Sequence, residues 1–292
     1  MKGVKELKAR IKSVTNIQKI TRAMEMVAST KLRRLQDRAM ATRPFADRIE
    51  AMMRRVAAHA DPSASPLLQV SDRVETEALV VVVGDKGLCG AYNANLLKHA
   101  VGHIAASREQ GVATKLYLIG RKAQMFFAKV KDSDIVWAHP GVVEKVEYQD
   151  IRRAMDLLVE SFVAGEVQRV HVAYTKMASM ASFVPTTQDL LPVAPPDADA
   201  EGAGAGVDYI LEPSPDAIME RLLPRYLEMQ LYAAVLESLA SEFAARRMAM
   251  KSATDAADEM LGTLGMEYNK ARQEGITGEL LDIVGGVMVQ AG

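Results

Sequence analysis

The 292-residue sequence has a single cysteine, Cys89, so an internal disulfide and an internal dithiol switch are both excluded. It also lacks any apolar run near the ~20 residues that a bilayer span requires. The amino terminus has no apolar core typical of a signal peptide, so we expect the mature protein to begin near Met1 in a reducing cytoplasm. Only fifteen residues are aromatic, against seventeen methionines, which either fill helix seams or slide against a partner.

Acidic residues are scarce only at the amino-terminal end of the chain. Residues 1–60 carry fifteen Lys or Arg against five Asp or Glu, although the whole chain has a net charge of −1. A basic segment on a nearly neutral protein predicts an anionic partner, which is a nucleic acid, lipid headgroups or an acidic protein surface.

Glycine and proline are rare in the first segment, which favours a long helix. From residue 4 to 58 the only proline is Pro44, which should bend or divide the helix. Apolar residues recur there at helical spacing: Val4, Leu7, Ile11, Val14, Ile17, Ile20, Met24 and Val27. The segment 215–289 has heptad-like spacing and would be roughly 100 Å long as a helix. Its expected seam includes Tyr232, Val235, Leu239, Met250, Ala253, Ala257, Met260, Leu264 and Ala271.

The middle of the chain alternates short apolar runs with helical patterns. We expect strands at 79–83, 116–119, 135–137, 170–174 and 182–190, and helices at 91–110, 121–129 and 148–164. This alternation predicts a mainly parallel sheet covered by helices. The stretch 195–206 lacks residues able to form a core, so we expect a flexible loop with a disordered tip.

The economical architecture is α/β with long terminal helices. The N- and C-terminal helices form an antiparallel coiled coil, and a Rossmann-like α/β domain is inserted between them. The predicted divisions are a coiled-coil helix at 1–60, the α/β domain at 75–195, the loop at 195–212 and a second coiled-coil helix at 213–292. The alternative is two ordinary amphipathic helices that pack on the sheet.

The glycine-rich turn from Gly84 to Asn93 superficially resembles a phosphate-binding loop. It lacks the Gly-Lys-Ser/Thr ending of a P-loop and the Gly-x-Gly-x-x-Gly of a dinucleotide site, so we interpret it as a tight turn with a surface contact. His99 and His103 lie four residues apart on an expected helix, but no Cys or carboxylate nearby in the sequence completes a metal set. We therefore predict no cofactor, no metal and no catalytic residues.

Several blocks of the sequence carry a family resemblance. Ile11–Ala28 and the Asp85–Gly90 loop are similar to the amino-terminal helix and central motif of gamma subunits of F-type ATP synthases. Ala249–Asp255, Tyr268–Gln273 and the residues around Thr277 resemble the family's carboxy-terminal helix. The blocks span the chain in the family's order. Departures include Phe243, Arg247, Ala256 and the helix glycines Gly275, Gly278, Gly285 and Gly286, which predict a softer tip.

This resemblance implies a central rotor shaft that couples ion-driven rotation of the c-ring to conformational change at catalytic beta subunits, without a catalytic site of its own. It implies partners among the alpha, beta and epsilon subunits and the c-ring, at the cytoplasmic side of a bacterial inner membrane, peripheral to it. Contact with beta is expected at Met24, Arg272, Gln273 and Thr277. Contact with the c-ring or epsilon is expected at Tyr209, Glu212, Lys86 and Leu88.

Two other functions fit part of the sequence. A nucleic-acid-binding protein would explain the basic amino-terminal segment, although that segment lacks the interleaved aromatics of single-strand binders. A Rossmann-like enzyme would explain the α/β middle, and it would bind ATP or NAD tightly.

Overall fold

A computed structural model describes residues 2–57, 61, 65–139, 141, 148–180, 182–193 and 212–291. The chain divides into two compact units. One unit comprises residues 30–245, and the other comprises residues 1–29 together with residues 246–292. The predicted boundaries of the coiled-coil, α/β and loop segments stay predictions.

Two long helices contribute to both units. Helix α1 (Lys2–Ala57) has 56 residues and α5 (Pro215–Ala291) has 77. Helix α5 starts with a side-chain cap, because the hydroxyl of Ser214 accepts a hydrogen bond from Ala217 N at 3.2 Å. Pro44 lies inside the uninterrupted α1, so of the two expected effects, a bend or a division of the helix, the division is excluded.

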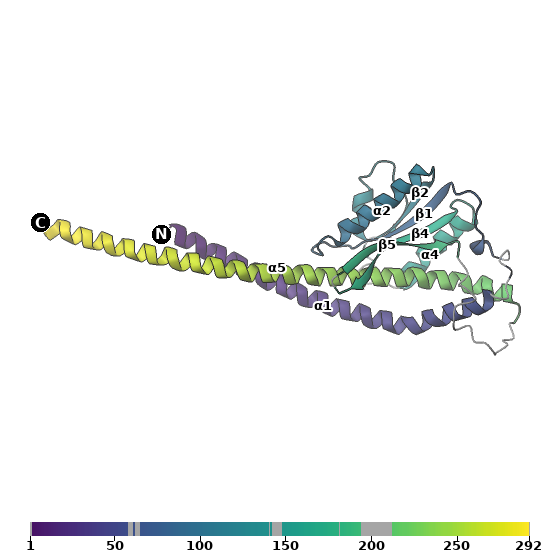
Figure 1. The fold of residues 1–292 in the computed structure, drawn as a ribbon, viewed down its shortest axis with the longest axis horizontal. Coiled ribbons are helices and arrows are strands. Elements are labelled where there is room, and N and C mark those ends of the chain that lie inside the picture. Colours follow the sequence, from purple (N-terminus) through teal and green to yellow (C-terminus); the bar gives the residue numbers. More distant parts are fainter. Residues whose placement is uncertain are drawn as a thin grey trace. The chain divides into compact units, whose positions relative to one another are not determined.

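In the smaller unit, the outer parts of α1 and α5 run antiparallel. Gln18 donates to Asp258, and the hydroxyls of Thr21 and Thr254 lie 2.7 Å apart, so residue numbers rise along one helix as they fall along the other. The predicted antiparallel pairing of the two chain ends is confirmed. Helix α5 continues past the start of α1 (Figure 1).

The seam of this helix pair agrees with the predicted one only in part, since Met250, Ala257, Leu264 and Ala271 lie in it as expected. Its more buried positions on α5 repeat every 3.5 residues on average, at Met250, Thr254, Ala257, Leu261, Leu264, Tyr268 and Ala271. On α1 the seam passes through Thr21 and Ala28, whereas the predicted Ile17 and Ile20 are 51% and 59% exposed. Met260, also predicted in the seam, is 53% exposed. Polar Gln18 and Thr21 occupy the seam, so the apolar pattern alone pointed to the neighbouring face.

The larger unit contains a five-stranded sheet. Its strands are β1 (Thr76–Val82), β2 (Ala113–Ile119), β3 (Asp134–His139), β4 (Arg169–Ser179) and β5 (Ser182–Leu191). They lie in the order β3-β2-β1-β4-β5, and every neighbouring pair is parallel except β4 with β5. The expected mainly parallel sheet is therefore confirmed.

Helices cover both faces of this sheet. Alternate residues of β1 point to opposite sides, so they belong to two different hydrophobic cores. Leu79, Val81 and Val83 belong to a core with α2 (Tyr92–Glu109) and α3 (Arg121–Phe127). Ala78, Val80 and Val82 belong to the other core, which includes α4 (Tyr148–Val163) and α5. A short 3-10 helix, η2 (Pro66–Leu68), contributes Leu67 to that second core.

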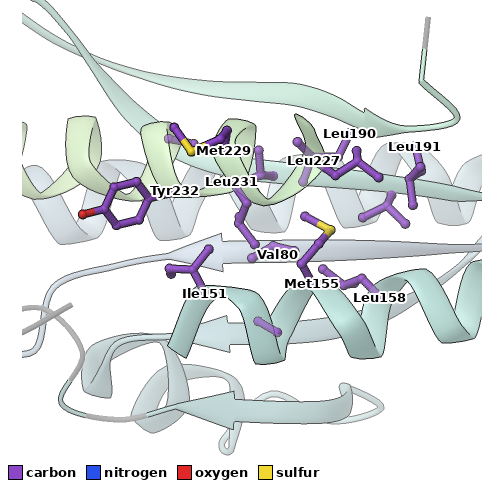
Figure 2. Close-up of a cluster of buried hydrophobic side chains, with 14 of the residues drawn as sticks. Val80, Ile151, Met155, Leu158, Leu190, Leu191, Leu227, Met229, Leu231 and Tyr232 are labelled. Atoms are coloured by element: carbon purple, nitrogen blue, oxygen red, sulfur yellow. The ribbon is translucent and has the colours of Figure 1, made fainter. Parts of the chain in front are cut away.

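Figure 2 shows this second core, where Ile151 and Met155 of α4 meet Val80 of β1 and Leu227 and Leu231 of α5. The inner part of α1 joins the same cluster through Ile49, Met53 and Val56. The inner part of α5 packs with the sheet and the inner part of α1 joins the same cluster, whereas the outer parts of the two helices pack with each other.

Candidate functional surfaces

The turn after β1 is held by its own side chains. Asn93 accepts a hydrogen bond from Gly84 N at 3.1 Å and donates one to the Lys86 carbonyl at 3.1 Å. The Gly84 amide is thus used within the turn. Asp85 extends the arrangement, because its Oδ1 accepts from the backbone N–H groups of Arg121 at 2.7 Å and Gly141 at 3.1 Å. The turn is therefore a fixed feature of the surface.

Tyr92 anchors this turn to α5. Its hydroxyl donates to the Ser238 carbonyl at 2.7 Å and lies 2.8 Å from the Ser238 hydroxyl, which donates to the Val82 carbonyl at 3.2 Å. Burial raises the pKa of the Tyr92 phenol far above its usual range, and the nearby Glu242 carboxylate adds to the shift. The hydroxyl therefore remains a donor at any physiological pH. Turn, sheet and helix are joined at one buried point.

Two predicted contact residues lie at the tip of the turn. Lys86 is exposed, and Leu88 is 61% exposed with a positive φ of 61°. A leucine rarely adopts that backbone conformation, and an apolar side chain gains nothing from water. Both features are typical of a residue positioned for contact with a partner.

The other two residues predicted to contact the same partners lie before α5. Glu212 is exposed, close to the Ser214 cap of that helix. Tyr209 lies outside the described residues. The structure therefore places three of the four predicted residues on exposed positions of one unit.

Met24 lies within an exposed apolar stripe of α1. Ile17, Ile20 and Val27 flank it at helical spacing and are each more than half exposed, while Met24 itself is half-buried. The stripe runs beside the seam rather than in it. An exposed apolar stripe on a helix is typical of a surface that another protein covers.

The end of α5 carries the remaining predicted residues. Arg272, Gln273 and Thr277 are all exposed, and the Thr277 hydroxyl donates back to the Gln273 carbonyl at 3.0 Å. Sequence reasoning missed the apolar side chains that share this end of the helix. These are Ile276, Leu280, Leu281, Ile283 and Val284, each at least 50% exposed. Their spacing of three or four residues was the signal in the sequence.

The histidines are arranged differently from the predicted surface pair. His99 faces Thr187, with its Nε2 2.9 Å from the hydroxyl oxygen. His103 instead meets Glu77 of β1 and His171 of β4 on the α2 side of the sheet. The carboxylate that the local sequence lacked comes from a strand 26 residues earlier in the chain.

In the described part of the chain, none of the helices has a stretch apolar and long enough to cross a bilayer.

The chain has two long terminal helices that pair with each other and an α/β domain inserted between them in the sequence. This arrangement is that of a central stalk subunit of a rotary complex. The sequence profile of a family described as ATP synthase matches residues 3–288. The ATP synthase gamma chain of Gemmatimonas aurantiaca is 43% identical over 288 residues, covering 99% of both chains. That of Glaesserella parasuis is 40% identical over 287 residues, covering 98% of this chain and 99% of its own. The chain belongs to the family of ATP synthase gamma chains.

Solved structures agree on the fold. One chain of the Euglena gracilis mitochondrial ATP synthase (OSCP/F1/c-ring, rotational state 3) superposes with a TM-score of 0.66 at 16% identity, covering 99% of this chain and 94% of its own. A chain of the Tetrahymena thermophila mitochondrial ATP synthase central stalk and c-ring gives 0.60 at 20% identity, covering 80% and 99%. At these identities the likeness concerns the fold alone.

Proposed function

We propose that this chain is the central shaft of an ATP synthase, coupling ion-driven rotation of the c-ring to ATP synthesis or hydrolysis at catalytic beta subunits. The observation that carries the proposal is the antiparallel helix pair in which α5 outruns α1 and keeps an apolar stripe exposed. A single helix in water is unstable without a surface that covers such a stripe. A ring of alpha and beta subunits around the shaft would supply that surface.

Coupling requires that the shaft present different contacts as it turns. Met24 lies on the apolar stripe of α1, whereas Arg272, Gln273 and Thr277 provide polar groups on α5. A beta subunit that faces one of these surfaces and then another experiences different interaction energies, so its conformational equilibrium shifts with the rotation angle. The excess of basic residues in the first 60 suits acidic surfaces on the surrounding subunits.

The α/β domain would serve as the foot of the shaft. Lys86 and Leu88 at the exposed turn, with Glu212 and Tyr209 before α5, would contact the epsilon subunit and the c-ring. Force applied to the turn reaches α5 through the buried Tyr92–Ser238 contact, without passing through a flexible connection. Rotation of the c-ring would therefore be transmitted to the long helix.

Such an assembly would hold the chain at the cytoplasmic side of the bacterial inner membrane, peripheral to it and attached through the c-ring. Proton or other ion transport would then be a property of the assembled complex and not of this chain.

The direct test is gentle affinity purification of the full chain from its host membranes, with the associated proteins identified by mass. We expect alpha, beta, epsilon and c subunits together with ATPase activity. Recovery with nucleic acid, in a complex that dissociates steeply with salt, would favour the nucleic-acid-binding alternative. Tight ATP or NAD binding by the isolated chain would favour the Rossmann-like enzyme.

A further inference from the structure

One group of side chains in the α/β domain has no role in the shaft. Glu77 of β1, His103 of α2 and His171 of β4 place one ligand atom each within 4.8 Å of one another. The Glu77 side chain is 6% exposed and that of His171 is 11% exposed. A carboxylate placed this deep is costly unless a cation or several hydrogen bonds compensate it.

The distances within this group match those of a metal site. Nε2 of His103 lies 3.2 Å from Glu77 Oε1, and Nε2 of His171 lies 3.5 Å from Glu77 Oε2. Zinc–nitrogen and zinc–oxygen bonds of about 2.0–2.1 Å in a tetrahedron place neighbouring donor atoms about 3.3 Å apart. Both separations lie close to that spacing, and each involves a different oxygen of the Glu77 carboxylate.

The surrounding contacts orient the donor atoms. Nδ1 of His171 lies 2.7 Å from Oδ1 of Asp189, and Thr114 donates its hydroxyl hydrogen to Glu77 at 3.0 Å. With Nδ1 of His171 donating to Asp189, its Nε2 turns toward the Glu77 carboxylate. A carboxylate that orients a histidine through its other nitrogen is the usual outer partner of a metal ligand.

The second histidine supplies an independent observation. Nε2 of His103 is buried and makes no hydrogen bond of good geometry within the described part of the structure, although Glu77 Oε1 lies 3.2 Å away. Buried polar nitrogens are nearly always satisfied, so this atom needs either a proton shared with Glu77 or a cation bound beside it. That nitrogen is also the atom of His103 that faces Glu77.

We propose that Glu77, His103 and His171 bind one divalent zinc-like cation, with Asp189 holding His171 in its ligating orientation. Two imidazoles and one carboxylate suit Zn²⁺ far better than Mg²⁺, which prefers oxygen ligands. A water molecule would complete the tetrahedron. The ion would tie β1, α2 and β4 together on one face of the sheet and, through Asp189, the antiparallel β5.

A cavity of about 480 Å³ lies near this group and is lined by residues of α2, β2 and the segment after α3. Thr114, whose hydroxyl donates to Glu77, lines it, whereas Glu77, His103 and His171 do not.

The test uses the purified full-length chain, stripped of metal with a chelator and titrated with Zn²⁺ by calorimetry. We expect one ion per chain, negligible binding of Mg²⁺, and a rise in Tm of roughly 5–10 °C at a hundredfold excess of Zn²⁺ over Kd. Cobalt in place of zinc should give the visible absorption of a tetrahedral site.

Three variants separate this site from adventitious binding. His103→Gln and His171→Gln should each weaken Zn²⁺ binding by about 100-fold or more. His99→Gln is the matched control, since it removes an imidazole one turn away on the same helix. Circular dichroism of each variant establishes whether the fold is retained, and the less buried His103→Gln decides the question if His171→Gln misfolds. Absence of Zn²⁺ binding by the stripped wild-type chain, or equal binding by His103→Gln and wild type, overturns the proposal.

Discussion

The hydroxyl of Thr21 on α1 lies 2.7 Å from the hydroxyl of Thr254 on α5, and both side chains are buried in the helix seam. Each hydroxyl also lies near a carbonyl of its own helix, Thr21 at 3.0 Å from that of Gln18 and Thr254 at 2.9 Å from that of Met250. Because a hydroxyl has one hydrogen, one threonine donates across the seam while the other donates to its own helix. The pair is a buried polar contact in a seam that also contains the polar Gln18. It fixes which residues of the two helices face each other, because a slip in register would bury each hydroxyl against apolar side chains.

Replacement of these threonines by the isosteric valine tests that contact. Thr21→Val alone should destabilise the chain by about 1 kcal/mol, since the Thr254 hydroxyl loses a buried partner. The double change Thr21→Val with Thr254→Val should be nearly neutral, because no unsatisfied hydroxyl is left. Urea unfolding followed by circular dichroism measures the three variants as a double-mutant cycle. A double variant that loses the full sum of the single effects would contradict this account.

Tyr92→Phe should destabilise the α/β domain by about 1–3 kcal/mol, because it removes the donor to the Ser238 carbonyl at the joint with α5. Tyr117→Phe is the matched control. That tyrosine is equally buried, but its hydroxyl makes only a 3.3 Å contact with Ser161. Thermal unfolding of both variants measures the difference, and an equal loss at the two positions would count against a special role for the Tyr92 joint.

Two glycines should respond to alanine in opposite directions. Gly120 has a φ of 101°, and an added Cβ would lie 1.7 Å from the Val83 carbonyl oxygen, so Gly120→Ala should cost at least about 3 kcal/mol. Gly102 lies inside α2 with nothing near the added methyl group, so Gly102→Ala should stabilise by about 0.5–1 kcal/mol. Melting temperatures of the two variants provide the comparison, and a loss of stability in Gly102→Ala would be inconsistent with the described α2.

Arg272→Ala combined with Gln273→Ala should lower the ATPase activity of the reconstituted complex severalfold, because both side chains are exposed at the predicted beta contact. The chain's own unfolding should be unchanged, since neither side chain is buried. Glu259→Ala is a suitable control, as an exposed position of α5 outside the predicted contact. Unchanged ATPase activity in the double variant would remove both residues from the coupling mechanism.

Leu88→Asn tests the foot of the shaft. Asparagine tolerates a positive φ better than leucine does, so the fold should be retained or slightly stabilised, while the apolar contact is lost. We expect weaker recovery of epsilon and c subunits in affinity purification. Val70→Asn removes an even more exposed apolar side chain elsewhere in the same unit and should leave recovery unchanged. Normal recovery with Leu88→Asn would show that this turn is not the contact.

Much of the fold could be predicted because local signals coincide with the ends of elements. The apolar run before Gly84 and the run before Gly120 both form strands within a few residues of the predicted ranges. The helix seam was less predictable. Over a few turns, repeats of 3.6 and 3.5 residues select nearly the same positions. The prediction followed the apolar Ile17 and Ile20, whereas the polar Gln18 and Thr21 occupy the seam.

The candidate sites show a sharper limit. Predicted contacts such as Arg272 and Thr277 rest on a resemblance, and the structure adds the exposed apolar side chains around them. The Glu77–His103–His171 group could not be found from spacing, because it depends on which strands become neighbours. Those three residues come together only because β1 pairs with β4 and α2 covers the face of both strands that carries Glu77 and His171.

The spacing of the buried positions in the seam also gives the helix pair a handedness. Positions that repeat every 3.5 residues require the two helices to coil around each other to the left. A torque in the same sense tightens the coil and presses the seam closed, whereas a reverse torque unwinds it. The pair therefore resists twisting more strongly in one direction than in the other.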